Sequence, residues 1–207
     1  MKKWFGYLVL SALLVGFPMV SYFYLKGGYN YRKAAIELME DHGKMPDLQT
    51  MERMRGQLPD SLRGNMVVVG WLSEDAPTAA IVYGRVLDSL YDQFADSPHL
   101  YFTTIADSTI SDEFVDQWLA TYGLPQEDPM LSILRPSGTT FDGDKAAFGL
   151  PSSSSNPVVA LVDSSQTIIK HYDLIEREET IGLVQLISLF IPLPEEEDII
   201  LARDKEL

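Results

Sequence analysis

The chain of 207 residues contains no cysteine. Disulfide bonds, thiolate nucleophiles, Cys-ligated zinc and iron–sulfur clusters are therefore excluded from its chemistry. Basic residues are also few, because 16 lysines and arginines stand against 30 acidic residues, for a formal charge of −14. A surface of this sign repels phosphate backbones, so no nucleic-acid partner is expected. The acidity suits either simple solubility or a basic protein partner.

The rest of the composition is that of a folded protein. Apolar residues make up 46% of the chain and charged residues 22%, which is enough to build a hydrophobic core. The length suits one membrane segment followed by one soluble domain.

The first apolar segment has the features of a membrane anchor. Residues 4–25 carry no charged side chain, and a helix of this length spans a hydrocarbon core of roughly 30 Å. Aromatic residues near both ends resemble the belts found at membrane interfaces: Trp4, Phe5 and Tyr7, then Tyr22, Phe23 and Tyr24. We expect residues 1–25 to form a short cytoplasmic stub and a transmembrane anchor.

A cleaved signal peptide is the competing interpretation of the same segment. Signal peptides have an apolar region of ~7–15 residues that ends at small residues, whereas this run is longer and ends in Tyr22-Phe23-Tyr24-Leu25. Lys2 and Lys3 favour a cytoplasmic N-terminus, although basic residues at 26, 32 and 33 weaken that signal. The expectation is a single-pass protein of the bacterial inner (cytoplasmic) membrane, with its soluble domain on the periplasmic side.

Three further regions follow the anchor. Residues 26–44 are predicted to be a tether with a short helical patch that ends at Gly43. Residues 45–192 are predicted to form the folded domain. Residues 193–207 form an acidic tail with one apolar island, Ile199-Ile200-Leu201.

Apolar, β-branched runs and helical periodicity predict the elements of the domain. Strands are expected at 66–71, 100–105, 130–134, 157–163 and 167–172, the last two as a hairpin. Helices are expected at 77–95, from a cap at Thr109 or Ser111 to Gly123, and at 178–189. Ser73 or Asp75 would cap the first helix, and Pro77 suits its first turn. Residues 136–155 read as a long loop with a helical turn at 146–150. Parallel crossovers followed by a hairpin predict a mixed sheet with helices on both faces.

Three stretches of the domain resemble the thioredoxin superfamily. The segment Met45-Pro46-Asp47-Leu48 is similar to the entry segment of membrane-anchored members. Residues 62–69, Leu-Arg-Gly-Asn-Met-Val-Val-Val, resemble their lead into the first central strand. Residues 157–163, Pro-Val-Val-Ala-Leu-Val-Asp, resemble the strand that opens with the superfamily's cis-proline, which places Pro157 at that position. The resemblance implies a thioredoxin-like α/β fold.

Within that superfamily the chain resembles the Sco (SenC) family, whose members assemble the copper site of cytochrome oxidase. The family pattern G-F-T-x-C-x-x-x-C-P aligns with residues 70–79, so Glu74 and Thr78 stand at the two cysteine positions. Ser155, or its neighbour Asn156, falls at the position of the family's histidine ligand. The resemblance therefore implies a member that has lost all three copper ligands. Cu(I) prefers thiolate or thioether and Cu(II) prefers imidazole, so neither metal nor another cofactor is expected at these positions.

Other candidate sites have simpler interpretations. Glu74 and Asp75 suit ordinary charge at a helix N-terminus better than a functional carboxylate pair. The cluster of His42, Met45, Met51 and Met54 contains soft ligands, but packing explains it better because methionine-rich copper motifs usually repeat. Serines 152–155 lack a nucleophile elbow and a nearby base, so they read as a loop.

These observations predict a non-catalytic, membrane-anchored accessory protein without catalytic residues. Its vacated site would dock to, or help assemble, a respiratory membrane complex such as cytochrome oxidase. One alternative is a permanent structural subunit of a membrane complex that is held through the C-terminal tail. A second alternative is residual copper handling by the methionine and histidine side chains.

Overall fold

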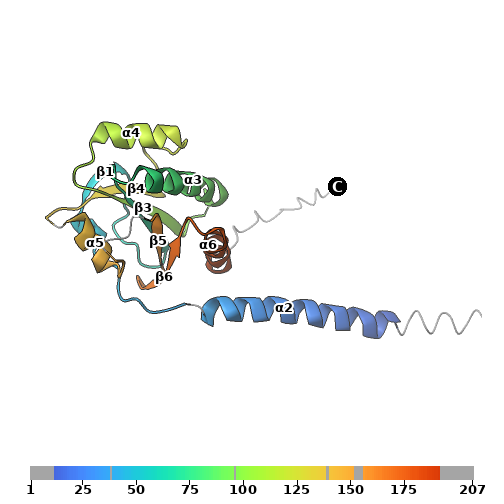
Figure 1. Ribbon diagram of the computed structural model, residues 1–207. Coiled ribbons are helices and arrows are strands. Elements are labelled where there is room, and N and C mark those ends of the chain that lie inside the picture. Colours follow the sequence, from blue (N-terminus) through green and yellow to red (C-terminus); the bar gives the residue numbers. More distant parts are fainter. Residues whose placement is uncertain (1–11, 38, 96, 139, 152–155, 192–207) are drawn as a thin grey trace, which may run out of the picture. The chain divides into compact units, whose positions relative to one another are not determined.

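The computed structural model describes residues 12–37, 39–95, 97–138, 140–151 and 156–191. The chain divides into two compact units between Met39 and Glu40. The first unit consists of the π-helical segment η1, Ala12–Gly16, and the helix α2, Phe17–Glu37. The second unit holds the six-stranded sheet and the remaining helices (Figure 1).

The helix of the first unit extends beyond the predicted anchor into the predicted tether. Within the described ranges, no helix is both long and apolar enough to cross a membrane. Residues 4–11 of the predicted span, and the stub before them, lie outside the described residues. Helix α2 continues without interruption to Glu37, so most of the predicted tether is helical. Large apolar side chains along this unit are exposed, including Phe17 (67%), Val20 (69%) and Leu25 (69%).

The last part of the predicted tether belongs to the folded domain. Residues 40–44 run along strand β6, Ile168–Asp173, where the backbone N–H of His42 donates to the carbonyl of Ile168 at 3.0 Å. Lys44 Nζ adds a hydrogen bond to Thr167 Oγ1 at 2.8 Å. Strand β6 lies at the edge of the sheet, where unpaired backbone groups need partners. The segment supplies those partners, a contact that residue periodicity does not reveal.

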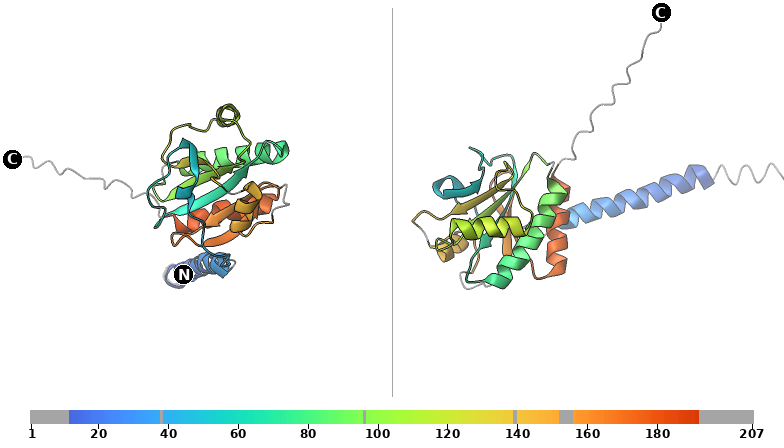
Figure 2. Two further views of the ribbon diagram at one scale, coloured as in Figure 1. Left: turned by 90° about the vertical axis from the view of Figure 1, so that its left-hand side faces the viewer. Right: turned by 90° about the horizontal axis from the view of Figure 1, so that it is seen from above.

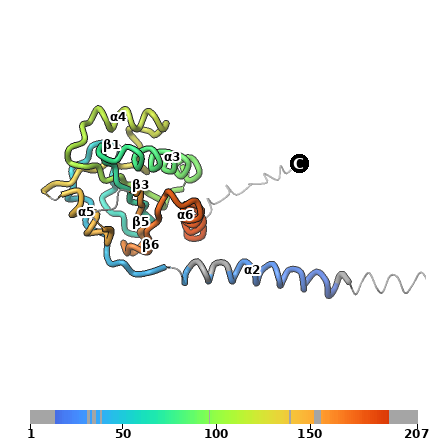
Figure 3. Tube along the Cα trace, in the orientation of Figure 1, coloured from blue at the N-terminus to red at the C-terminus, as the bar shows by residue number. Residues whose placement is uncertain are grey.

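The sheet has the strand order β1-β4-β3-β2-β5-β6. Its centre is β2, Met66–Leu72, in which every residue is buried, as the continuous apolar run predicts. Strands β3, Leu100–Ala106, and β4, Leu131–Arg135, continue the sheet in parallel on one side. Strand β5, Val158–Val162, and β6 form the predicted antiparallel hairpin on the other side. The tube in Figure 3 follows this path from β2 to β6.

Three helices cover one face of the sheet: α3, Pro77–Phe94; α4, Asp112–Thr121; and α6, Arg177–Phe190. Strands β2, β3 and β4 lie side by side in chain order. The two crossovers between them run in the same direction across the sheet. Because parallel crossover connections are right-handed, α3 and α4 lie on the same face (Figures 1 and 2). Ser111, one of the two residues predicted to cap α4, accepts from the N–H of Phe114 at 3.1 Å.

The packing between sheet and helices on this face is tight. A Cβ atom added to Gly70 of β2 would lie 2.3 Å from the ring of Tyr83. Tyr83 in turn shares a hydrogen bond of 2.7 Å with Thr104 of β3, and its ring stacks on Trp118 of α4 at 5.7 Å. Glycine at position 70 therefore lets α3 approach the sheet closely.

The opposite face is covered by α5, Phe141–Ala147, and by the chain from residue 45 to 62. On this face, alternating side chains of β2 share one hydrophobic cluster with Phe148 and with apolar residues of the chain from 45 to 62. The β2 residues are Val67, Val69 and Trp71, and the others are Leu48 and Leu62. The predicted helical turn at 146–150 is therefore displaced toward the N-terminus. Thr140 caps the start of α5, because its Oγ1 accepts from the N–H of Gly143 at 3.1 Å; this cap was not predicted.

Strand β1, Glu52–Gly56, was not predicted. Its sequence, Glu-Arg-Met-Arg-Gly, has only one buried side chain, that of Met54, and it carries a register shift between Arg53 and Arg55 where it pairs with β4. A strand of this composition has no apolar alternation, so its pairing depends on the partner strand and on ion pairs.

Candidate functional site

The connection between β2 and α3 leads to the two positions, Glu74 and Thr78, that the family resemblance aligns with cysteines. Residues 73–76 link the end of the central strand to Ala76, the N-cap of α3, which makes no side-chain hydrogen bond. Ser73 Oγ accepts instead from the N–H of Asp75 at 3.3 Å, so neither predicted cap reaches the helix. Pro77 lies in the first turn as predicted, where its missing N–H costs nothing. The first turn of α3 thus has no side-chain acceptor for its free N–H groups.

Two of the three positions that the family alignment singles out are described, and both are on the surface. Glu74 and Thr78 are both exposed at the start of α3. Ser155 lies outside the described residues, and Asn156 is exposed, with Nδ2 donating to Asp173 Oδ2 at 2.6 Å. A carboxylate and a hydroxyl on the surface are hard oxygen ligands and do not fit a copper ion. In the described part of the chain, no three His, Asp or Glu side chains are arranged to hold a metal.

The structure corrects the prediction of a cis peptide bond before Pro157. Among the described residues no peptide bond is cis, so the bond before Pro157 is trans. Trans is the intrinsic preference of such a bond by about 0.5–1 kcal/mol. Pro157 is buried, and its carbonyl accepts from the N–H of Leu174 at 2.9 Å, which fixes the entry to β5.

A cavity lies beside Pro157 at this edge of the sheet. Its volume is about 30 Å³, which is enough to hold a water molecule. Segments far apart in the sequence meet around it: the end of β2, the start of α3, α5 and the start of β5. Its lining is mostly apolar and includes Trp71, Ala76, Ala79, Phe141, Leu150 and Pro157.

Two polar groups stand out in this lining. Trp71 is 8% exposed and meets Phe148 edge to face at 5.3 Å, yet its buried Nε1–H has no acceptor among the residues the structure describes. Lys145 lies with Nζ 4.6 Å from the centre of the Phe141 ring. Burial lowers the pKa of Lys145, although the charges of Asp142 and Asp107 oppose the shift. Lys145 belongs to no recognisable sequence motif, and it lies in α5 just before the helical turn predicted at 146–150.

The residues of the methionine and histidine cluster make packing contacts in the domain. Met45 and Met51 pack against the hydrophobic core, and Met54 is 9% exposed. The ring of His42 lies 4.6 Å from that of His171, whose Nε2 is 2.8 Å from the carbonyl oxygen of Phe148. Burial lowers the pKa of His171, and the nearby His42 lowers it further against the effect of that hydrogen bond. These contacts are packing and strand-edge contacts.

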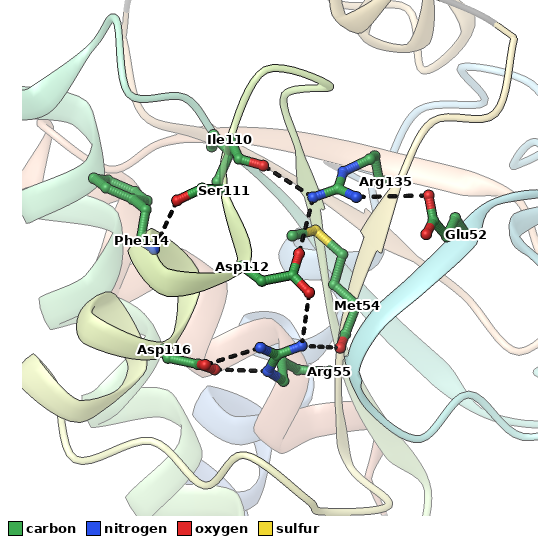
Figure 4. Close-up of polar contacts among 9 residues, drawn as sticks. All are labelled: Glu52, Met54, Arg55, Ile110, Ser111, Asp112, Phe114, Asp116 and Arg135. Atoms are coloured by element: carbon green, nitrogen blue, oxygen red, sulfur yellow. Dashed lines mark hydrogen bonds and ion pairs between the residues drawn. The ribbon is translucent and has the colours of Figure 1, made fainter.

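A second group of titratable residues joins β1, β4 and α4 (Figure 4). Arg55 donates from Nε and Nη2 to the two carboxylate oxygens of Asp116 at 2.6 and 2.8 Å. Asp112 lies between Arg55 and Arg135, with Oδ1 3.0 Å from Nη2 of Arg135. The Arg55 guanidinium lowers the pKa of Asp116 by hydrogen bonding and by charge. Every carboxylate here is engaged by an arginine, so the group ties the unpredicted strand β1 to the domain.

Comparison with known proteins identifies the fold. No model of a known family matches the sequence, and no curated protein does either. A candidate protein disulfide isomerase from Bacteroides thetaiotaomicron has a TM-score of 0.57 and 18% identity, with 73% of this chain and 90% of that chain covered. A thiol-disulfide isomerase from Corynebacterium glutamicum has a TM-score of 0.52 and 15% identity, with 72% and 97% covered.

The Sco family is also among the similar structures. BsSco, a member of that family of cytochrome c oxidase assembly proteins, has a TM-score of 0.52 and 11% identity, with 72% of this chain and 95% of that chain covered. At these identities the likeness shows the fold alone. The domain has a thioredoxin-like fold, with a mixed sheet flanked by helices. Its solved neighbours include thiol-disulfide oxidoreductases and Sco proteins, whereas this chain has no thiol.

Proposed function

We propose that the chain is a non-catalytic, membrane-anchored protein that docks a partner at its vacated active-site edge. The observation that carries the proposal is the cysteine-free connection between β2 and α3, built on an otherwise complete thioredoxin-like sheet. Thiol–disulfide exchange requires a thiolate, which these residues cannot supply. Binding is the remaining use of a surface that the fold still forms.

The partner in this proposal is a membrane protein complex, with a respiratory oxidase as the specific candidate. The uncharged run of residues 4–25 supports anchoring in a bacterial inner membrane with the domain on the periplasmic side. The exposed apolar side chains of η1 and α2 support lipid contact, because soluble helices rarely expose such residues on this scale. The Sco-like fold supports the choice of a respiratory partner by analogy of fold.

Two measurements on the full chain test this proposal. Purification in mild detergent at native expression should recover a membrane complex, identified by mass spectrometry. Recovery of the protein alone would count against docking. Incubation with Cu(I) and Cu(II), followed by desalting and elemental analysis, should leave no stoichiometric copper. Tight binding of one copper per chain would overturn the non-metal part of the proposal.

A permanent structural subunit is the second candidate. The apolar island Ile199-Ile200-Leu201 in the acidic tail favours it, because an apolar group beside four acidic residues suits pairing with another chain. The tail lies outside the described residues. Truncation after Pro194 should release the protein from its complex, and continued co-purification of the truncated chain would contradict this candidate.

A further inference from the structure

Residues 40–44, which we call the strap, lie along the outer edge of β6. The backbone N–H of His42 donates to the carbonyl of Ile168 at 3.0 Å, and the N–H of Ile168 donates in return to the carbonyl of Gly43 at 2.9 Å. Strand β6 is the last strand of the sheet, so the strap occupies the positions that a further strand would use. The strap is also the first segment of the folded domain after the unit that contains α2.

Two imidazole rings meet between the strap and β6. The ring centres of His42 and His171 are 4.6 Å apart. His171 is held from another side, because its Nε2 lies 2.8 Å from the carbonyl oxygen of Phe148. A carbonyl oxygen only accepts, so Nε2 donates and a second proton on this ring would bind at Nδ1. That proton would place a cation against the ring of His42.

The charged groups around the two rings are unequal in number. Glu40 Oε2 lies 3.4 Å from His42 Nε2, so its carboxylate balances one positive charge. On the side of α5, His171 meets the uncharged carbonyl of Phe148. Its neighbour in β6, Lys170, keeps a positive charge and holds Nζ over an aromatic ring at 4.8 Å. In the described part of the chain, one carboxylate therefore faces two imidazoles, and the second cation has no partner of its own.

We propose that protonation of both imidazoles releases residues 40–43 from the edge of β6. The far end of the strap stays in place, because Lys44 Nζ donates to Thr167 Oγ1 at 2.8 Å and to the carbonyl of Ser165 at 3.0 Å. Imidazoles change charge between about pH 5 and pH 8, a range in which this lysine stays charged. Release uncovers the edge of β6 and lengthens the connection between α2 and the domain by up to about 13 Å.

The direction of the effect follows from proton binding. Burial lowers the pKa of His171 in the closed strap, the hydrogen bond to Phe148 opposes this shift, and the charge of His42 adds to it. The released form therefore binds the proton more tightly than the closed form, so acid favours release. The strap is fully stable above about pH 6.5, and its opening equilibrium rises by up to about tenfold per pH unit below that value for one proton.

Hydrogen exchange of the full chain in detergent micelles, resolved by mass spectrometry, measures this opening. Exchange is compared between about pH 7.5 and about pH 5 and corrected for the intrinsic rate at each pH. Peptides that cover the strap should lose protection progressively toward acid pH. Peptides that cover β3 report global unfolding and should keep their protection. No partner takes part, so the outcome is independent of the proposed docking function.

Three variants separate proton release from simple loosening of the strap. His42→Gln places a neutral amide at this position, so protection of the strap should become nearly independent of pH. His99→Gln is the matched control, because this third histidine is exposed and lies outside the strap, and it should behave as the parent chain. Glu40→Gln removes the carboxylate beside His42 and should move release to higher pH, a shift that lost packing alone does not produce.

Three results would overturn the proposal. The first is protection of the strap that does not change with pH in the parent chain. The second is the same loss of protection in His42→Gln as in the parent chain. The third is an equal loss in β3, which would mean that acid unfolds the whole domain instead of releasing the strap.

Discussion

Substitution of Gly70 by alanine tests the packing of α3 on the sheet beside the candidate site. The new Cβ would lie 2.3 Å from Tyr83 Oη and Cζ, so the ring has to move. Tyr83 is 2% exposed and shares its hydrogen bond with buried Thr104, so movement leaves polar groups unpaired. Overpacking costs about 1–3 kcal/mol, and a lost buried hydrogen bond about 1–3 kcal/mol. Together these predict a loss of roughly 2–6 kcal/mol in the free energy of unfolding.

Urea unfolding of the full chain, followed by near-ultraviolet circular dichroism, measures this loss. Gly182→Ala is the matched control, because its Cβ would lie 3.6 Å from Tyr172 Cε1, an ordinary contact. That change in α6 should be neutral or stabilising by up to about 1 kcal/mol, from helix propensity. Adding Tyr83→Leu to Gly70→Ala should recover part of the loss by making room. A Gly70→Ala protein within about 0.5 kcal/mol of the parent chain would refute the packing argument.

Three smaller changes test other parts of the structure. Asp116→Asn should lower the unfolding midpoint at neutral pH. Because the folded-state pKa of Asp116 lies below its ordinary value, the difference should shrink as pH falls through the acid range, and a constant difference would argue against the Arg55 pair. The parent chain should lose stability as pH falls below about 6.5, since the pKa of His171 is lowered in the folded state, and His171→Gln should flatten that slope in pH-dependent melts. Ser111→Ala should lower the free energy of unfolding by about 1 kcal/mol, because the N–H of Phe114 at the start of α4 loses its acceptor. Urea titration measures this loss, and an unchanged midpoint would mean that another group caps α4.

The central elements could be predicted from the sequence because runs of neighbouring residues indicate which segments are buried. The run from Met66 to Leu72 is apolar throughout and forms the buried central strand, and Pro77 marks the first turn of α3. Strand β1 could not be predicted, because Arg55 is held by Asp116, which lies in a distant helix. The edge pairing of residues 40–44 also depends on a distant strand.

The candidate site was only partly predictable. The alignment put Glu74 and Thr78 at the two cysteine positions, but it could not show that both side chains are exposed. The cavity depends on Trp71, Lys145 and Pro157, which come from three segments that only the folded chain brings together. The trans bond before Pro157 shows that a residue match to a family does not fix backbone conformation.

Site-specific photo-crosslinking tests docking at the vacated edge most directly. A photoreactive p-benzoylphenylalanine would replace exposed Glu74 beside the candidate site, and in a matched protein it would replace Arg85, exposed on the same helix. Irradiation at native expression, followed by mass spectrometry, identifies any captured chain. We expect a membrane protein crosslinked from position 74 and not from position 85. Capture from position 85 alone, or from neither position, would contradict docking at this edge.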